Sequence, residues 1–263
     1  MFFICPMRLI FAESEDTKMD YRFEICANSV ESCLAAQEGG AHRVELCAGI
    51  PEGGTTPSYG EIVVARRLLN IRLHVIIRPR GGDFLYSPVE VDTMVEDIRM
   101  ARQAGADGVV FGCLDENADL DMPAMRRLMD AARGCSVTFH RAFDRCRNPF
   151  GVMEQLVELG VDRILTSGQQ PTAPEGAAMI KELVERAGGR ISILAGCGVN
   201  EGNIRQLAEA TGVKEFHFSA RESVKSRMKL ANPDVLMGAA GVDEYTRQVT
   251  TAARVRATIE RLG

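Results

Sequence analysis

Short runs of apolar residues alternate along the chain with longer segments whose apolar residues recur every three or four positions. The short runs resemble strands, and each precedes a segment with helical spacing. Eight strands that each precede a helix are typical of a parallel sheet built from βα units. The expected strands are residues 22–26, 43–47, 73–78, 108–112, 136–140, 163–167, 191–195 and 215–219.

Local signals support the helices between these strands. Ser58 and Ser87 each stand three residues before a glutamate, the pattern of a capping box at a helix start. Asn148, which precedes a proline, and Asn200 are expected to begin two further helices.

A repeated joint between helix and strand indicates how the units are arranged. Residues 40–46, 105–111, 160–166 and 212–218 each begin with a glycine that ends a helix and continue into an apolar strand. Eight such units in roughly 240 residues favour a closed TIM-like (β/α)8 barrel, a single domain over residues 21–263. An open doubly wound sheet would carry a G-x-G-x-x-G motif after its first strand, and this chain does not.

The composition narrows the function classes. The chain has 263 residues, is 46% hydrophobic and carries a formal net charge of −5, so nothing in its charge favours nucleic-acid binding. No apolar run approaches the roughly 18 residues that a membrane span needs. Residues 1–20 lack the basic region of a signal peptide, and we expect a poorly ordered extension, or a start codon assigned ahead of Met19.

The cysteines do not form a recognisable zinc or redox motif. The chain has eight cysteines and no C-x-x-C. Without a secretion signal, we expect reduced thiols in the cytoplasm, most of them acting as small buried apolar side chains.

The strands combine apolar and polar residues in a way that predicts a polar barrel centre. Alternation places Glu24 and Cys26 of the first strand on the inward face, and Glu45 and Cys47 of the second strand likewise. His74, His140 and His217 fall inside by the same argument. Barrel interiors are usually filled by Val, Ile and Leu, so this content indicates a site.

Two interpretations apply to the inward glutamates. Glu24 and Glu45 could form an interior salt-bridge network with Arg78, Arg80 or Arg141 that holds the mouth together. Alternatively, they act chemically, because clustered ionisable groups in a cleft are typical of active sites.

His140 and His217 have three interpretations. They could be a general acid and base, they could bind a divalent metal together with the glutamates, or they could be interior histidines with satisfied hydrogen bonds.

The glycine-rich loops after the strands have two interpretations: they could form an anion site, or they could be merely tight turns. Glycine-rich turns that enter helices after the last strands are typical of phosphate-binding corners, where backbone N–H groups face an anion. The anion-binding residues expected at the mouth are Arg78, Arg80, Arg141, Ser167, Gly168, Gly196 and Gly198.

Cys26 and Cys47 hold equivalent positions at the ends of neighbouring strands. Such strands lie about 4.8 Å apart, and two adjacent thiolates suit a soft ion such as Cu(I). Two other outcomes are open at this point: both thiols could simply fill the core, and barrel stagger could place them at different levels.

Several long strings carry a family resemblance. The segments EICANS, RVELCAG, EGGTTPS, IRPRGGDFLYS, VTFHRAFD and LTSG occur in this order, and the chain from about Tyr21 to its last helix resembles the CutC family of copper homeostasis proteins. The resemblance implies a TIM-like barrel, a cytoplasmic location, homo-oligomers and copper handling, with Cys26 and Cys47 as the Cu(I) ligands. It implies no established reaction. Cys197 departs from the family pattern, which has Gly or Ala there, and could add a third thiol at the mouth.

Two hypotheses for function follow. In the first, the protein serves copper homeostasis by binding Cu(I) through Cys26 and Cys47 at the barrel mouth. In the alternative, it is a TIM-barrel enzyme, lyase- or isomerase-like, that acts on a small anionic or phosphorylated metabolite. The arginines and glycine turns would then bind charge, and the residues moving protons would be Glu24, Glu45, His140 and His217. A purely structural, oligomeric scaffold is a third interpretation.

Overall fold

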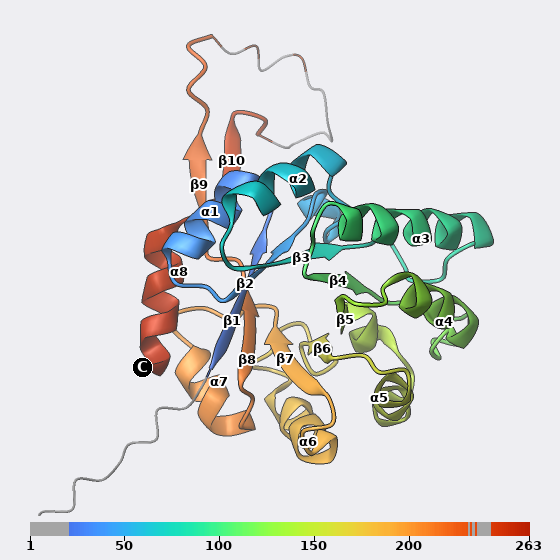
Figure 1. Ribbon diagram of the computed structural model, residues 1–263. Helices are drawn as coiled ribbons and strands as arrows, with labels where there is room; N and C mark the ends of the chain where they lie inside the picture. The colour runs from blue at the N-terminus through green and yellow to red at the C-terminus, as the bar shows by residue number, and fades with distance from the viewer. Residues whose placement is uncertain (1–20, 231, 233–234, 236–242) are drawn as a thin grey trace, which may run out of the picture.

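Eight parallel strands close into a barrel in the computed structural model, which describes residues 21–230, 232, 235 and 243–263 (Figure 1). Each strand pairs with its successor, and the last pairs with the first. The strands are β1 (Arg22–Ala27), β2 (Arg43–Leu46), β3 (Arg72–Ile76), β4 (Gly108–Phe111), β5 (Ser136–Phe139), β6 (Arg163–Thr166), β7 (Ser192–Gly196) and β8 (Glu215–Phe218). The predicted TIM-like barrel is confirmed.

The helices surround this barrel, one after each strand except where a hairpin intervenes (Figure 1). They are α1 (Val30–Glu38), α2 (Tyr59–Leu68), α3 (Pro88–Gln103), α4 (Met122–Ala131), α5 (Pro149–Glu158), α6 (Ala177–Ala187), α7 (Ile204–Thr211) and α8 (Ala252–Ile259). Three short 3₁₀ turns are η1 (Ile50–Glu52), η2 (Arg141–Arg145) and η3 (Glu260–Leu262).

The helices begin where the predicted caps place them, except that one helix begins four residues later than predicted. Both capping boxes form, at Ser58 and Ser87, and Asn148 caps α5. The helix expected at Asn200 begins only at Ile204, because Asn200 and Asn203 bond each other's backbone and hold a turn ahead of α7.

The two faces of the strands separate as alternation predicts. The outward residues of β1 and β2, such as Ile25 and Val44, belong to the large apolar core that includes the helices. A separate small cluster comprises Cys47, Ile76 and Val110, with Cys26 packed against it. The inward face at the mouth is therefore distinct from the core beneath the helices.

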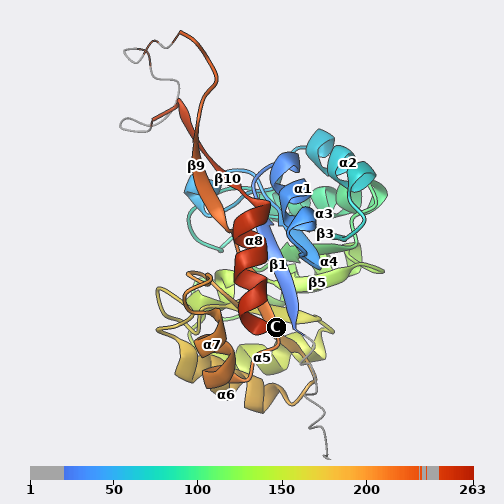
Figure 2. The same cartoon turned by 90° about the vertical axis from the view of Figure 1, so that its left-hand side faces the viewer.

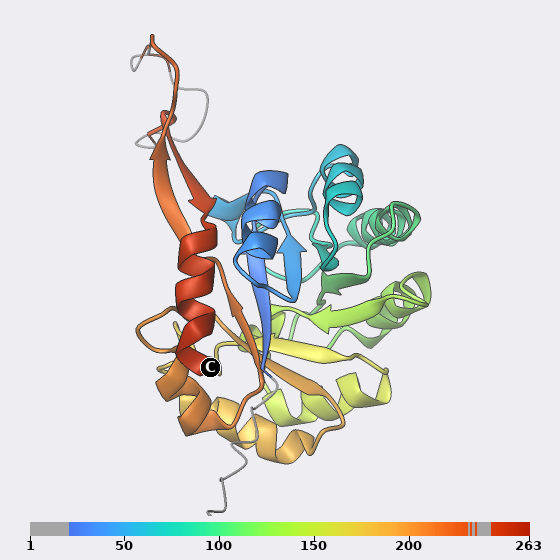
Figure 3. The same cartoon turned by 60° about the vertical axis from the view of Figure 1, so that its left-hand side comes forward.

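A two-stranded hairpin follows β8 and was not predicted. β9 (Arg221–Lys225) pairs antiparallel with β10 (Thr246–Thr250), and the hairpin projects away from the barrel (Figures 2 and 3). Its strands, RESVK and TRQVT, contain no apolar run that would identify them. The chain then returns to the barrel through α8, which approaches α1 so closely that a Cβ at Gly39 would lie 2.5 Å from Val255.

The expectation for residues 1–20 lies outside the described residues. Within the described part, no helix combines the length and the apolar character needed to cross a membrane.

A glycine on β4 makes room for one of the inward histidines. A Cβ placed on Gly108 would lie 2.5 Å from Nε2 of His74, whose ring is fully buried. His74 therefore occupies space that only a glycine leaves free. Burial lowers the pKa of His74 to about 3, so its ring is neutral at physiological pH.

Replacing this glycine tests the packing of the barrel centre. Gly108→Ala should lower the free energy of unfolding by about 1–3 kcal/mol, because the added methyl group overpacks the ring. The matched control is Gly60→Ala on exposed helix α2, where no side chain lies closer than 4.0 Å; it should raise stability by about 0.5 kcal/mol. Urea denaturation measures both. Equal effects of the two changes would contradict the close approach of His74.

Candidate functional site

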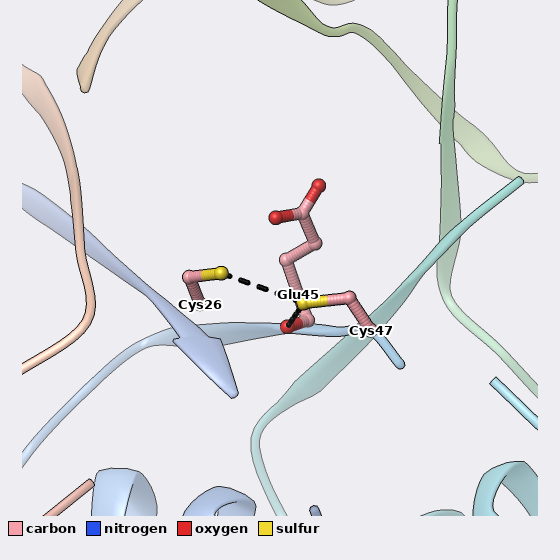
Figure 4. A group of neighbouring side chains, drawn as sticks. All are labelled: Cys26, Glu45 and Cys47. Atoms are coloured by element: carbon pink, nitrogen blue, oxygen red, sulfur yellow. Dashed lines mark hydrogen bonds between the residues drawn. The ribbon is translucent and has the colours of Figure 1, made fainter. Parts of the chain in front are cut away.

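Cys26 and Cys47 meet at the carboxyl ends of β1 and β2. Their sulfur atoms lie 3.4 Å apart, and the two side chains point toward each other (Figure 4). The parallel register explains this, because Cys26 is paired with Glu45 and the Cys47 N–H donates to the carbonyl of Ala27. Barrel stagger does not separate the pair. Cys26 is partly exposed, whereas Cys47 is buried.

A carboxylate completes a group of three donor atoms. One oxygen of Glu45 and the sulfurs of Cys26 and Cys47 all lie within 4.8 Å of one another. Cys197 is not in this group, and its thiol donates to the Pro171 carbonyl at 3.1 Å. The third thiol considered from the sequence therefore lies away from the pair in this structure.

The electrostatics of the pair distinguish its two sulfurs. The pKa of Cys26 is held well below its ordinary value, first by the hydrogen bond from Cys47, against the effect of burial, and then by His217 and Arg221. The pKa of Cys47 is raised well above its ordinary value by the same bond and by burial. The pair therefore holds one proton, with Cys26 as thiolate and Cys47 as donor.

Arg221 supplies the positive charge beside the thiolate. Its Nη2 donates to Sγ of Cys26 at 3.2 Å and to the Cys26 carbonyl at 3.3 Å. Arg221 is the first residue of β9, directly after the polar loop that follows β8. A cation within hydrogen-bond reach of a sulfur is the arrangement that stabilises a thiolate.

Glu24 lies beneath the thiols and is fully buried. It accepts hydrogen bonds from Nε of Arg43 and, at 2.7 Å, from Nδ1 of His217. Burial alone would raise the pKa of Glu24, but the charge of Arg43 and the bond from His217 outweigh it and hold that pKa well below its ordinary value.

The predicted partners of the glutamates were wrong. Arg78, Arg80 and Arg141 form no ion pair with Glu24 or Glu45 in the described part of the chain. Arg43 pairs with Glu24 instead, and His217 with Glu45. Strand register explains why: Arg43 is directly opposite Glu24 in the β1–β2 ladder. The signal was available in the sequence, because alternation places Arg43 on the same inward face as Glu45.

His217 connects the lower ion pair to the thiols. It is directly opposite Glu24 in the β8–β1 ladder, and its Nε2 lies 3.6 Å from Glu45. Burial would lower the pKa of His217, but hydrogen bonds with Cys26 and Glu24 raise it well above its ordinary value. His217 is therefore an imidazolium held between two acidic groups.

Glu45 has the opposite character to Glu24. Burial raises its pKa to about 8; His217 opposes this rise, and the negative charge of Cys26 adds to it. Glu45 therefore carries a proton in a large fraction of molecules near neutral pH. Two carboxyl groups at one barrel mouth thus differ in charge because their environments differ.

The mouth contains two adjoining hollows. The larger, about 440 Å³, is lined by Arg221, Arg254 and Gly198 among others. The smaller, about 330 Å³, is lined by Glu45, Arg78 and His140 among others. Both hollows share a set of lining residues at their boundary. This shared set is Cys26, Gly53, Arg141 and His217.

The arginines expected to bind an anion are placed differently from one another. Arg78 lines the smaller hollow, and Arg141 lines both while its Nε donates to Asp144 at 2.7 Å. Arg80 lines neither, because its guanidinium is bound to Glu90 and Asp83.

The residues expected in the strand-end turns have mainly local contacts. Ser167 donates through its N–H and hydroxyl to Asp144, a carboxylate of the protein itself. Gly168, at φ +71°, packs against the carbonyl of Gly176. Gly196 leaves room for the side chain of Leu165, because a Cβ at position 196 would lie 2.5 Å from Cδ1 of Leu165. Of these four residues, only Gly198 lines one of the two hollows.

The barrel and its mouth define a class: a (β/α)8-barrel protein with a buried thiol pair set in a network of charged side chains. The model of the CutC family matches residues 21–222, and the chain belongs to that family.

Individual relatives agree with this assignment. The chain is 66% identical over 245 residues to a family protein CutC of Bacteroides fragilis, an alignment that covers 92% of this chain and 98% of the relative. It is 46% identical to the human copper homeostasis protein cutC homolog, over 90% of this chain and 87% of the relative. The solved structure of a CutC protein from Streptococcus agalactiae is similar, with a TM-score of 0.73, 38% identity and coverage of 76% of this chain and 98% of that one.

The pair of Arg43 and Glu24 generates a stability prediction. Arg43→Met removes one of the two cations that compensate the buried charge of Glu24, leaving His217 alone, and should lower the free energy of unfolding by about 3–5 kcal/mol. Adding Glu24→Gln should recover part of that loss, because the uncompensated charge is removed. A double-mutant cycle by urea denaturation measures the coupling. Additive effects of the two changes would contradict the pairing.

The same pair sets a pH dependence. Because the pKa of Glu24 is lower in the folded state, its contribution to stability is present above the unfolded carboxyl pKa of about 4.3 and is lost as pH falls through the folded value. The wild-type protein should therefore lose stability below pH ~4 more steeply than the variant with both changes.

Proposed function

We propose that this protein acts in copper homeostasis by binding Cu(I) through Cys26 and Cys47. The observation that carries the proposal is the 3.4 Å separation of the two sulfur atoms at the barrel mouth. Two metal–sulfur bonds of about 2.3 Å permit a sulfur separation of up to about 4.6 Å, so small side-chain rotations suffice to admit an ion. Soft thiolate ligands suit both Cu(I) and zinc, and the charge balance of the site decides between them.

The charge balance of the site favours a monovalent ion. The pair with one proton carries a single negative charge, and two thiolates holding one Cu(I) carry the same charge. Cu(I) would therefore replace the Cys47 proton without changing the net charge that Arg221 and His217 surround. A divalent ion would make the thiol pair neutral and leave both cations with less compensation. Glu45 would lie beside the ion as a neighbour, because its hard oxygen is a poor ligand for Cu(I).

The human relative is named a copper homeostasis protein, which supports the copper proposal and names no compartment. The compartment is proposed from the thiols alone. All seven described cysteines are free thiols, and the proposed site needs its two thiols reduced. The cytoplasm supplies that condition, and we propose a cytoplasmic location for this reason.

The proposal predicts a specific loss of copper affinity. Cys26→Ser with Cys47→Ser should weaken Cu(I) binding by at least about 100-fold, more than the loss of an outer partner causes. The control is Cys33→Ser, a buried cysteine of α1 whose pKa burial raises to about 12. Competition with a Cu(I) chelator under anaerobic conditions measures the affinities.

The displaced proton adds a pH test to this experiment. Because the pKa of Cys47 is raised, one proton should leave for each bound ion, and the dissociation constant should fall about tenfold per pH unit near neutrality. Unchanged Cu(I) affinity in the paired serine variant would exclude this site. A Cu(I) affinity of the wild type that does not depend on pH would exclude it as well.

We also propose that the protein is a homo-oligomer joined through its hairpin. A two-stranded ribbon is at best marginally stable alone in water, and β9–β10 projects away from the barrel (Figure 2). Its strands and the segment after β9 expose large apolar side chains, with Val224 41%, Met228 69% and Leu230 84% exposed. A second copy covering this hairpin would bury them.

Removing these apolar groups should weaken association. Met228→Ser with Leu230→Ser should shift the protein toward monomer, whereas Val89→Ser, at a 73% exposed position on α3, should not. Size-exclusion chromatography with light scattering measures the mass. A wild-type monomer, or an unchanged oligomer in the hairpin variant, would contradict this arrangement.

A further inference from the structure

The smaller hollow contains a buried hydrogen-bond donor without a partner. His140 follows β5, is 4% exposed and lines this hollow, and its Nε2 has no hydrogen-bond partner in the described part of the chain. An unpaired polar group at such depth lowers the stability of a folded protein, because it has lost its hydrogen bonds to water. A ligand that accepts a hydrogen bond would satisfy it.

The tautomer of His140 is fixed by its surroundings. Nδ1 accepts the N–H of Ala142 at 3.2 Å, so the ring proton is on Nε2. The ring also lies against Gly112, where a Cβ would be 2.8 Å from Nδ1. Burial, together with the charge of Arg78, lowers the pKa of His140 to about 3, so the ring is neutral and presents one N–H.

Arg78 brings a positive charge that no carboxylate balances. Its guanidinium donates to the backbone carbonyls of Glu52, Gly54 and Gly82, and within the described residues it forms no ion pair. The side chain is only 5% exposed, and buried charges are otherwise almost always paired.

Two aromatic residues surround this guanidinium. The Phe84 ring centroid lies 5.2 Å from Cζ of Arg78 and 4.9 Å from the centroid of the His140 ring. Arg78 and His140 therefore contact the same aromatic side chain. The Tyr86 hydroxyl is near Arg78, but burial raises the pKa of Tyr86 to about 12, and a neutral phenol does not compensate a cation.

We propose that the smaller hollow binds a small metabolite through a carboxylate group, with Nε2–H of His140 donating to it and Arg78 balancing its charge. This site is separate from the thiol pair in its donors, although both share the wall formed by Cys26 and His217. The hollow, at about 330 Å³, suits a molecule of a few carbon atoms.

A singly charged group fits this hollow better than a phosphate. Arg78 is a buried cation of this wall without an ion pair among the described residues, and one negative charge would offset it. Asp144 also lines the hollow, and its carboxylate would repel a dianion. Asp144 forms an ion pair with Arg141 and accepts hydrogen bonds from Ser167. It therefore does not compete with a bound carboxylate for Arg78.

Direct binding of small carboxylates tests the proposal. The probes are pyruvate and acetate, with methyl pyruvate as the uncharged comparison and inorganic phosphate as the dianion. Isothermal titration calorimetry on the intact, copper-free protein should show pyruvate bound and methyl pyruvate not bound. Nitrogen-15 NMR of the histidine side chains should show the His140 Hε2 resonance moving downfield when pyruvate is added, because its N–H gains a charged acceptor.

Variants separate the donor from the fold. His140→Phe should weaken pyruvate binding about 10- to 100-fold, the range expected for a hydrogen bond to a charged group, and His140→Gln, which keeps an N–H, should restore part of it. Arg78→Lys should bind more tightly than Arg78→Met, because it keeps the charge. Circular dichroism confirms folding. Cys47→Ser, at a residue that does not line the smaller hollow, should retain pyruvate binding while weakening copper binding.

Several results would overturn the assignment. Absence of heat and of an NMR shift with every probe would do so, as would equal affinity of the wild type and His140→Phe. Tighter binding of phosphate than of either carboxylate would assign the hollow to a different anion. Loss of pyruvate binding in Cys47→Ser would merge this site with the copper site.

Discussion

The structure depends on one buried ion pair, in which Glu24 is held between Arg43 of the next strand and His217 of the last strand. It links β8, β1 and β2, the three strands at which the barrel closes. Arg43 and His217 keep Glu24 charged, and Glu24, after Cys26, helps to keep His217 protonated. The charge of His217 then adds to the hydrogen bond from Cys47, which is the first cause of the lowered pKa of Cys26. A carboxylate inside the barrel thereby contributes to the charge of a sulfur at the mouth.

The mouth combines two chemistries that share a wall. On one side of Cys26 and His217 lie Arg221 and the larger hollow; on the other lie Glu45, Arg78 and the smaller hollow. The thiol pair suits a soft cation, whereas the smaller hollow suits an anion. The two sites are compatible because different side chains balance their charges: Arg221 and His217 at the thiol pair, and Arg78 in the smaller hollow. A copper function therefore does not use all the polar residues of this mouth.

Periodicity was sufficient to predict most of the fold and the core of the site. Alternation identified the inward faces of β1 and β2, and register then brought Cys26 and Cys47 together. Arg43 was within reach of the same reasoning, but an arginine at the start of a strand resembles a solvated end. Arg221 and the hairpin could not be found by pattern, because hydrogen bonds across polar residues leave no apolar period. The role of Asp144, which binds Ser167, depends on tertiary contacts alone.

Arg221 is at once the first residue of the projecting hairpin and the group that donates to Cys26. The β9–β10 hairpin and the Cys26 thiolate are therefore coupled through the side chain of Arg221. A displacement of β9 would move the Arg221 guanidinium away from Sγ of Cys26. A change of charge at that sulfur would in turn change the strength of the hydrogen bond that fixes the first residue of β9. The proposed assembly through this hairpin and the proposed ion binding at the mouth would therefore be thermodynamically linked, and the linkage would act equally in both directions.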